Sequence, residues 1–129
     1  MPRYRTDLPQ LSGDIFLADG GVETDLIFNH GIEIREFAAH TLLPTPEGRA
    51  ALTQYFEAFL RLAKEMDTGF ILDTVTWKAH AYWGRALGAS SAELRAANED
   101  GHSGSPRPLC RKSKLDRVER SNRTARRRL

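Results

Sequence analysis

The sequence predicts an α/β fold with parallel strands. Two short apolar runs, Ile15–Ala18 and Phe70–Leu72, have the length of strands that are buried on both faces. Each run ends at an aspartate, Asp19 or Asp73, and a helical pattern follows each of them. Parallel β/α proteins place their polar chemistry at the carboxyl ends of their strands in this way. We therefore expect a site at that edge of the sheet.

A long amphipathic helix is predicted between the two strands, at about residues 46–66. Thr45 suits the N-cap, and Pro46 suits the first helical position. Apolar residues then recur at the spacing of one helical face, and we interpret them as core: Leu52, Tyr55, Phe56, Phe59, Leu60, Ala63 and Met66. A strand, a helix and a second strand in this order predict a right-handed crossover.

Shorter helices are predicted on either side of these elements. Residues 22–29 carry a short apolar face after the first strand. Residues 80–87 have the pattern of another short helix, which Gly88 would end. Ser90 and Glu93 then have the spacing of a capping box at the start of a further helix.

The charge pattern divides the chain near residue 100. Residues 1–100 carry 9 Lys/Arg and 15 Asp/Glu, a net charge of −6, whereas residues 101–129 carry 10 Lys/Arg and 2 Asp/Glu, a net charge of +8. All eleven aromatic residues lie at or before Trp83. A segment so charged and so poor in apolar surface cannot offset the entropy lost on ordering. The sequence therefore predicts a leader at 1–13, an α/β portion at 14–100 and a disordered Arg-rich tail at 101–129.

The composition disfavours several classes of protein. Cys110 is the only cysteine, so an intrachain disulfide framework is excluded. The first 13 residues lack an apolar run of signal-peptide length, and no stretch has the length of a membrane span. We expect a cytoplasmic protein that makes no membrane contact. The basic tail suits phosphate contacts but has no aromatic residues for stacking on bases, so nucleic-acid binding is not expected.

No metal-binding pattern is present. The four histidines lack metal-ligand spacing with cysteine or carboxylate residues. We assign no metal ligand and no catalytic residue to this chain.

The first candidate binding residues follow the first strand. Asp19 can accept hydrogen bonds from an ammonium group, and Gly20 lets the backbone approach a ligand closely. The helix start that follows offers N–H groups to a carboxylate. The alternative is an ordinary turn in which the aspartate caps the next helix.

The second candidate residues follow the second strand. Trp77 can form a wall of a pocket, and the hydroxyl of Thr76 can orient a polar substrate. The alternative is a β-branched strand end whose tryptophan packs on the adjacent helix.

The two segments are most informative together. Residues 16–26 read FLADGGVETDL, and residues 69–79 read GFILDTVTWKA. The first resembles the opening strand, Asp-Gly-Gly turn and helix start of homocysteine S-methyltransferases. The second resembles the second strand and Thr-x-Thr-aromatic motif of the same family. Their order and the helix between them agree with the family, and the likeness covers about residues 14–100.

The resemblance implies a TIM-type (β/α)8 barrel that transfers a methyl group to the thiol of homocysteine and so makes methionine. In that family, cysteine-bound zinc holds the thiol as a thiolate. By motif match, Asp19 and Gly20 would bind the amino-acid end of homocysteine. Thr76 and Trp77 would lie in or near the methyl-donor side of the pocket. The donor stays open among S-methylmethionine, S-adenosylmethionine and betaine.

The chain departs from the family pattern after residue 100. A barrel of this type needs about 250 residues, whereas two of its β/α units are recognisable here. The zinc-ligand cysteines are absent, and Cys110 is not assigned to that role. We therefore expect an incomplete barrel, a truncated and inactive fragment without zinc, whose tail comes from a shifted reading frame, a truncated gene or missplicing.

Two non-enzymatic functions stay open. The chain is an interaction protein if its basic tail binds nucleic acid or an acidic partner. It is a regulatory fragment if it docks on a full-length paralogue.

Overall fold

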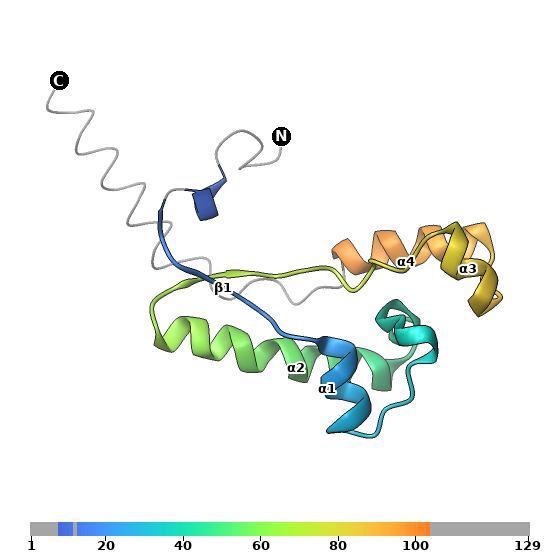
Figure 1. The fold of residues 1–129 in the computed structure, drawn as a ribbon, viewed down its shortest axis with the longest axis horizontal. Coiled ribbons are helices and arrows are strands. Elements are labelled where there is room, and N and C mark those ends of the chain that lie inside the picture. Colours follow the sequence, from blue (N-terminus) through green and yellow to red (C-terminus); the bar gives the residue numbers. More distant parts are fainter. Residues whose placement is uncertain (1–7, 12, 104–129) are drawn as a thin grey trace, which may run out of the picture.

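The computed structural model describes residues 8–11 and 13–103 (Figure 1). This part of the chain is mixed α/β and mostly helical, with a small parallel sheet. Its elements, in which η denotes a 3-10 turn, are η1 Pro9–Leu11, β1 Phe16–Ala18, α1 Val22–Phe28, η2 Arg35–Phe37, η3 Ala39–Leu42, α2 Pro46–Glu65, β2 Gly69–Ile71, α3 Ala81–Leu87 and α4 Ser91–Ser103.

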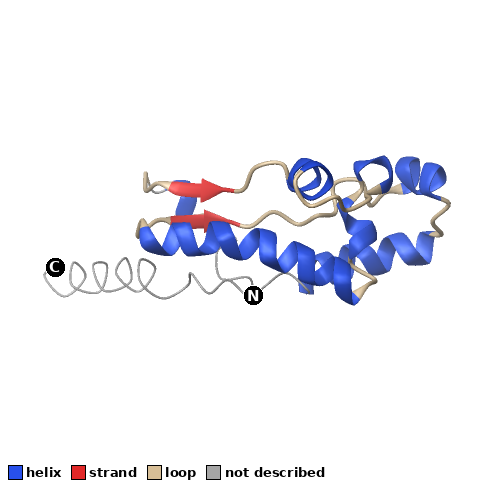
Figure 2. Cartoon of the chain, turned by 90° about the horizontal axis from the view of Figure 1, so that it is seen from below, coloured by secondary structure: helices blue, strands red, loops and turns tan. Residues whose placement is uncertain are grey.

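The two strands run parallel, as predicted, and point the same way in Figure 2. Leu17 of β1 lies opposite Phe70 of β2 in the register. The second strand begins one residue earlier than predicted, at Gly69, and Leu72 lies outside it. A Cβ at Gly69 would lie 2.2 Å from the ring of Phe16, so the absence of a side chain at Gly69 makes room for this ring.

Helix α2 begins and packs as its sequence predicts. The Gly48 N–H donates a hydrogen bond of 3.1 Å to the Thr45 hydroxyl, which caps the helix. The helix contacts both strands and runs alongside them (Figure 2). Most of the predicted face is buried or half-buried, but the core assignment of Met66 is wrong. Met66, which is the C-cap residue and follows the last residue of the helix, is 64% exposed.

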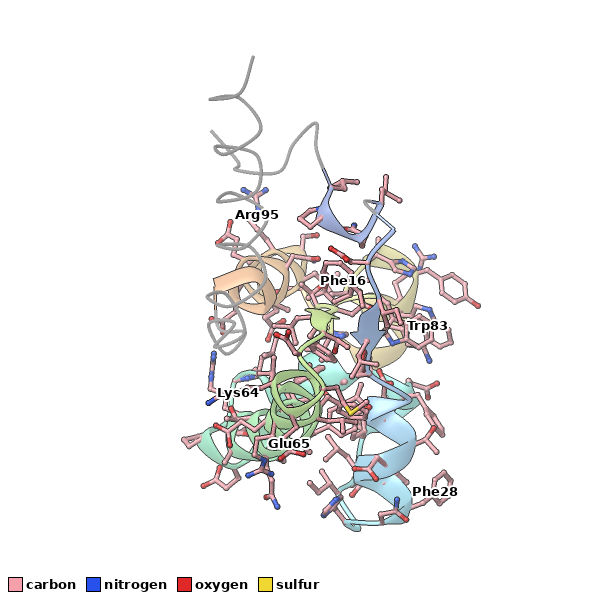
Figure 3. The ribbon with its side chains drawn as sticks, turned by 90° about the vertical axis from the view of Figure 1, so that its left-hand side faces the viewer. Phe16, Phe28, Lys64, Glu65, Trp83 and Arg95 are labelled. Atoms are coloured by element: carbon pink, nitrogen blue, oxygen red, sulfur yellow. The ribbon has the colours of Figure 1, made fainter. Side chains whose placement is uncertain are left out.

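The segment between α1 and α2 folds into η2 and η3. Leu42 and Leu43 are buried there against Leu26 of α1 and Leu52 of α2. Phe28, at the end of α1, instead projects away from this core (Figure 3). The core therefore lies between α1, the turns and α2.

Helices α3 and α4 lie side by side (Figure 1). Gly88 ends α3 in the left-handed conformation, at φ 71°, as predicted. The predicted capping box is present, because Ser90 N–H donates to Glu93 Oε2 at 2.7 Å and Glu93 N–H donates to Ser90 Oγ at 3.2 Å.

Helix α4 extends past the predicted boundary at residue 100, to Ser103. Two contacts join this part of α4 to the rest of the chain. Arg49 of α2 pairs with Asp100, and Gly101 is buried against Thr76. The rest of the predicted tail, 104–129, and residues 1–7 and 12 of the predicted leader lie outside the described residues.

None of the helices in the described ranges combines the length and the apolar character that crossing a membrane requires.

Candidate functional site

A cleft of about 450 Å³ opens at the carboxyl ends of β1 and β2. All four residues that the sequence singles out, Asp19, Gly20, Thr76 and Trp77, line it. Asp73, the other strand-end aspartate, lines it as well. The expected meeting of the two strand ends is therefore present in the structure.

Asp19 is half-buried and lines this cleft. The Tyr55 hydroxyl of α2 donates a hydrogen bond of 3.3 Å to Asp19 Oδ2. Burial raises the pKa of Asp19, the Tyr55 hydrogen bond lowers it, and the nearby carboxylates of Asp73 and Glu23 raise it further. Asp19 does not cap α1, because the N-cap is Gly21 and no side chain caps the helix. This arrangement differs from the simple capping turn that the sequence left as an alternative.

Gly20 lines the cleft, but its backbone does not require glycine. Its φ is not positive. A Cβ at Gly20 would lie 3.8 Å from the Tyr55 hydroxyl, which is an ordinary van der Waals contact. Close approach of a ligand at Gly20 stays a prediction.

Thr76 lies between the cleft and α4. Its hydroxyl is 2.8 Å from that of Thr74, so the two side chains share a hydrogen bond. Its methyl group packs against the backbone of Gly101, where a Cβ would lie 2.4 Å away. The position of Thr76 therefore depends on the docking of α4.

Trp77 is 61% exposed and forms one wall of the cleft. Its indole N–H donates a hydrogen bond of 2.9 Å to Glu23 Oε1, on α1. The neighbouring ammonium group of Lys78 lies 4.6 Å from the Trp77 ring centroid and 3.9 Å from that of Trp83. An exposed indole that is bonded to Glu23 and lies beneath the Lys78 ammonium group differs from the buried packing that the sequence left as an alternative.

Lys78 is only 6% exposed and donates a hydrogen bond to the backbone carbonyl of Glu36. It thereby joins the loop after β2 to η2. Glu36 has a φ of 53°, in the left-handed region that non-glycine residues rarely adopt. The lysine therefore bonds to a residue with an unusual backbone conformation.

Sequence reasoning gave no site role to Tyr55, Glu23 or Lys78. The signal for Tyr55 was its hydroxyl, since a buried tyrosine usually has a hydrogen-bond partner. Glu23 lies inside the first motif, but nothing local connects it with Trp77. Lys78 offered no signal, because lysine is almost never fully buried.

Within residues 8–11 and 13–103, no three His, Cys, Asp or Glu side chains lie close enough to hold a metal ion. The described residues thus do not fit the zinc site that the resemblance implies, and Cys110 lies outside them.

Comparisons with models of protein families, with curated proteins and with solved structures found no match.

Proposed function

We propose that the described residues are the first two β/α units of a TIM-type barrel of the homocysteine S-methyltransferase kind. In this proposal the cleft receives homocysteine. The observation that carries it is the meeting of Asp19 and Trp77 in one cleft, at the ends of two paired parallel strands. Active sites of TIM barrels lie at this end of the sheet.

The charges around the cleft favour a ligand with an ammonium group. Asp19, Glu23 and Asp73 all line it and are all acidic. Asp19 is half-buried, and it alone of the three accepts a hydrogen bond from the buried Tyr55. A carboxylate that is partly removed from water attracts an ammonium ion more strongly than one in bulk solvent. Asp19 is therefore assigned to the α-amino group of homocysteine.

The residues that follow β2 suit the less polar part of the ligands. Trp77 presents an exposed indole to the cleft, and the paired hydroxyls of Thr74 and Thr76 lie beside it. These side chains are assigned to the methyl-donor side. No methyl-transfer step is assigned to the described residues, because they supply no zinc ligands.

The proposal is tested by calorimetric titration of the purified chain with reduced L-homocysteine. We expect weak binding, with a Kd on the order of 1 mM. The Asp19→Asn variant should lose it, whereas Glu33→Gln, which changes an exposed acid that lines no part of the cleft, should keep it.

A second ligand sharpens this test. The compound 4-mercaptobutanoic acid is homocysteine without its α-amino group, and it should bind neither the wild-type chain nor Asp19→Asn. Equal binding of the two compounds, or equal homocysteine binding by the wild type and Asp19→Asn, would contradict the assignment of Asp19. Absence of all homocysteine binding would contradict the proposed function.

A further inference from the structure

We infer that Tyr55 is a positioning residue, whose hydroxyl holds the Asp19 carboxylate in place for the ammonium group of the ligand. The inference rests on the proposed function and extends it to a residue in the middle of α2. Tyr55 lines a second groove, between α1 and α2, and is not among the residues that line the cleft. It therefore acts through Asp19 and does not touch the ligand.

The core of α2 fixes the position of the Tyr55 ring. The residue is 8% exposed. Its ring meets that of Phe56 edge-on, with 5.1 Å between centroids, and lies tilted at the same distance from the ring of Phe59. Packing on both sides leaves the hydroxyl little freedom, so the hydrogen bond to Asp19 Oδ2 is set by the hydrophobic core.

The hydrogen bond has a defined direction. Burial raises the pKa of Tyr55, and the charge of Asp19 raises it further, while a backbone hydrogen bond from Gly20 opposes them. The phenol therefore stays protonated and remains a donor to Asp19 throughout the physiological range. A carboxylate has two oxygens with several lone pairs, so Asp19 can still accept from an ammonium ion.

This contact opposes the other influences on Asp19. Burial and the carboxylates of Asp73 and Glu23 favour its protonated form, whereas the Tyr55 hydrogen bond favours the ionised form. An ammonium ligand needs the ionised form. Tyr55 thus both orients the Asp19 carboxyl group and favours its ionised form.

The test compares Tyr55→Phe, which removes the hydroxyl and keeps the ring, with Tyr82→Phe, the same change on an exposed ring of α3. The carboxyl carbon of Asp19 is followed by NMR as a function of pH, with Asp19→Asn used to identify its signal. We expect the Asp19 pKa to rise in Tyr55→Phe and to stay unchanged in Tyr82→Phe.

Ligand binding gives the second measurement. In Tyr55→Phe the Kd for homocysteine at about pH 7 should weaken by about 3- to 10-fold. This is less than the full value of a hydrogen bond to a charged group, because the bond is already present in the ligand-free chain. The pH below which binding is lost should move upward with the Asp19 titration. A purely structural role for Tyr55 would weaken binding at every pH and leave that pH unmoved, and this result would overturn the inference.

Deuterium exchange gives a third measurement. Transfer into D2O replaces the Tyr55 hydroxyl proton together with the other exchangeable protons, so the Asp19 carboxyl signal should shift more in the wild type than in Tyr55→Phe. Equal shifts in the two chains would overturn the inference. The two proposals fail separately. If the wild-type chain binds no homocysteine, the proposed function and the ligand role of Tyr55 are both refuted. If Tyr55→Phe binds homocysteine and its Asp19 titration is unchanged, only the inference about Tyr55 is refuted.

Discussion

The indole N–H of Trp77 donates a hydrogen bond of 2.9 Å to Glu23 Oε1, across 54 positions of the sequence. Trp77 belongs to the loop after β2, and Glu23 belongs to α1, so the bond joins the two β/α units over the cleft that both residues line. Because this bond is exposed to water, its net stabilisation is small. Its main consequence is the orientation of the indole.

Glu23→Ala should release the indole of Trp77. In a Trp83→Phe background, where Trp77 is the only tryptophan, we expect stronger quenching of its fluorescence by acrylamide. The free energy of unfolding should change by less than about 1 kcal/mol. Glu33→Ala, which removes an exposed acid outside the cleft, is the matched control. Equal quenching in the two variants would show that Glu23 does not hold Trp77.

Asp19 should make the stability of the chain depend on pH. Its pKa is raised above the ordinary value of 3.8, chiefly by burial, so the folded chain binds this proton more tightly than the unfolded chain. Its contribution therefore favours folding in acid and is lost as the pH rises through the folded pKa. At about pH 7, Asp19→Asn should be more stable than wild type, by less than about 1 kcal/mol because the site is partly exposed to water.

Urea unfolding at about pH 4 and about pH 7 measures this effect. The advantage of Asp19→Asn should shrink at the lower pH. If Asp19→Asn were more stable than wild type by the same amount at both pH values, the pKa of Asp19 would not be raised in the folded chain.

The elements that the sequence located well are those with local signals. Thr45 caps the helix that begins at Pro46, and Ser90 and Glu93 bond to each other at the start of α4. Each signal is a contact between near neighbours, so the sequence contains both partners. Strand ends were placed less well, because Leu72 leaves the sheet where the three-residue partner strand β1 ends. The contact between α4 and α2 was missed because Asp100 pairs with Arg49, which is far away in the sequence.

The same distinction applies to the candidate site. The sequence alone could predict that Asp19 and Trp77 lie close together, because residues that follow parallel strands share one edge of a sheet. The contacts that hold them are not local. Tyr55 lies 36 positions from Asp19, and Lys78 lies 42 positions from Glu36. No periodicity or spacing in the sequence records such pairs, so the supporting residues required the folded chain.

Lys78→Met should destabilise the chain by about 1–3 kcal/mol, because it leaves the Glu36 carbonyl without its ammonium donor. Methionine keeps the length and the apolar stem of the side chain, so little packing is lost. Lys64→Met, on the exposed surface of α2, is the control and should change stability by less than about 0.5 kcal/mol. Urea unfolding checks both. A Lys78→Met variant as stable as wild type would show that the buried ammonium contributes nothing net.

Gly101→Ala tests the docking of α4 on the cleft, because two effects on stability have opposite signs. Helix propensity alone predicts a gain of about 1 kcal/mol. A Cβ at this position, however, would lie 2.4 Å from the methyl group of Thr76, and a β-branched side chain cannot easily turn away. We expect the steric effect to prevail, with a loss of about 1–3 kcal/mol in urea unfolding. Adding Thr76→Ser removes the methyl group and should restore most of the loss. A stabilised Gly101→Ala chain with Thr76 intact would show that α4 does not dock on Thr76.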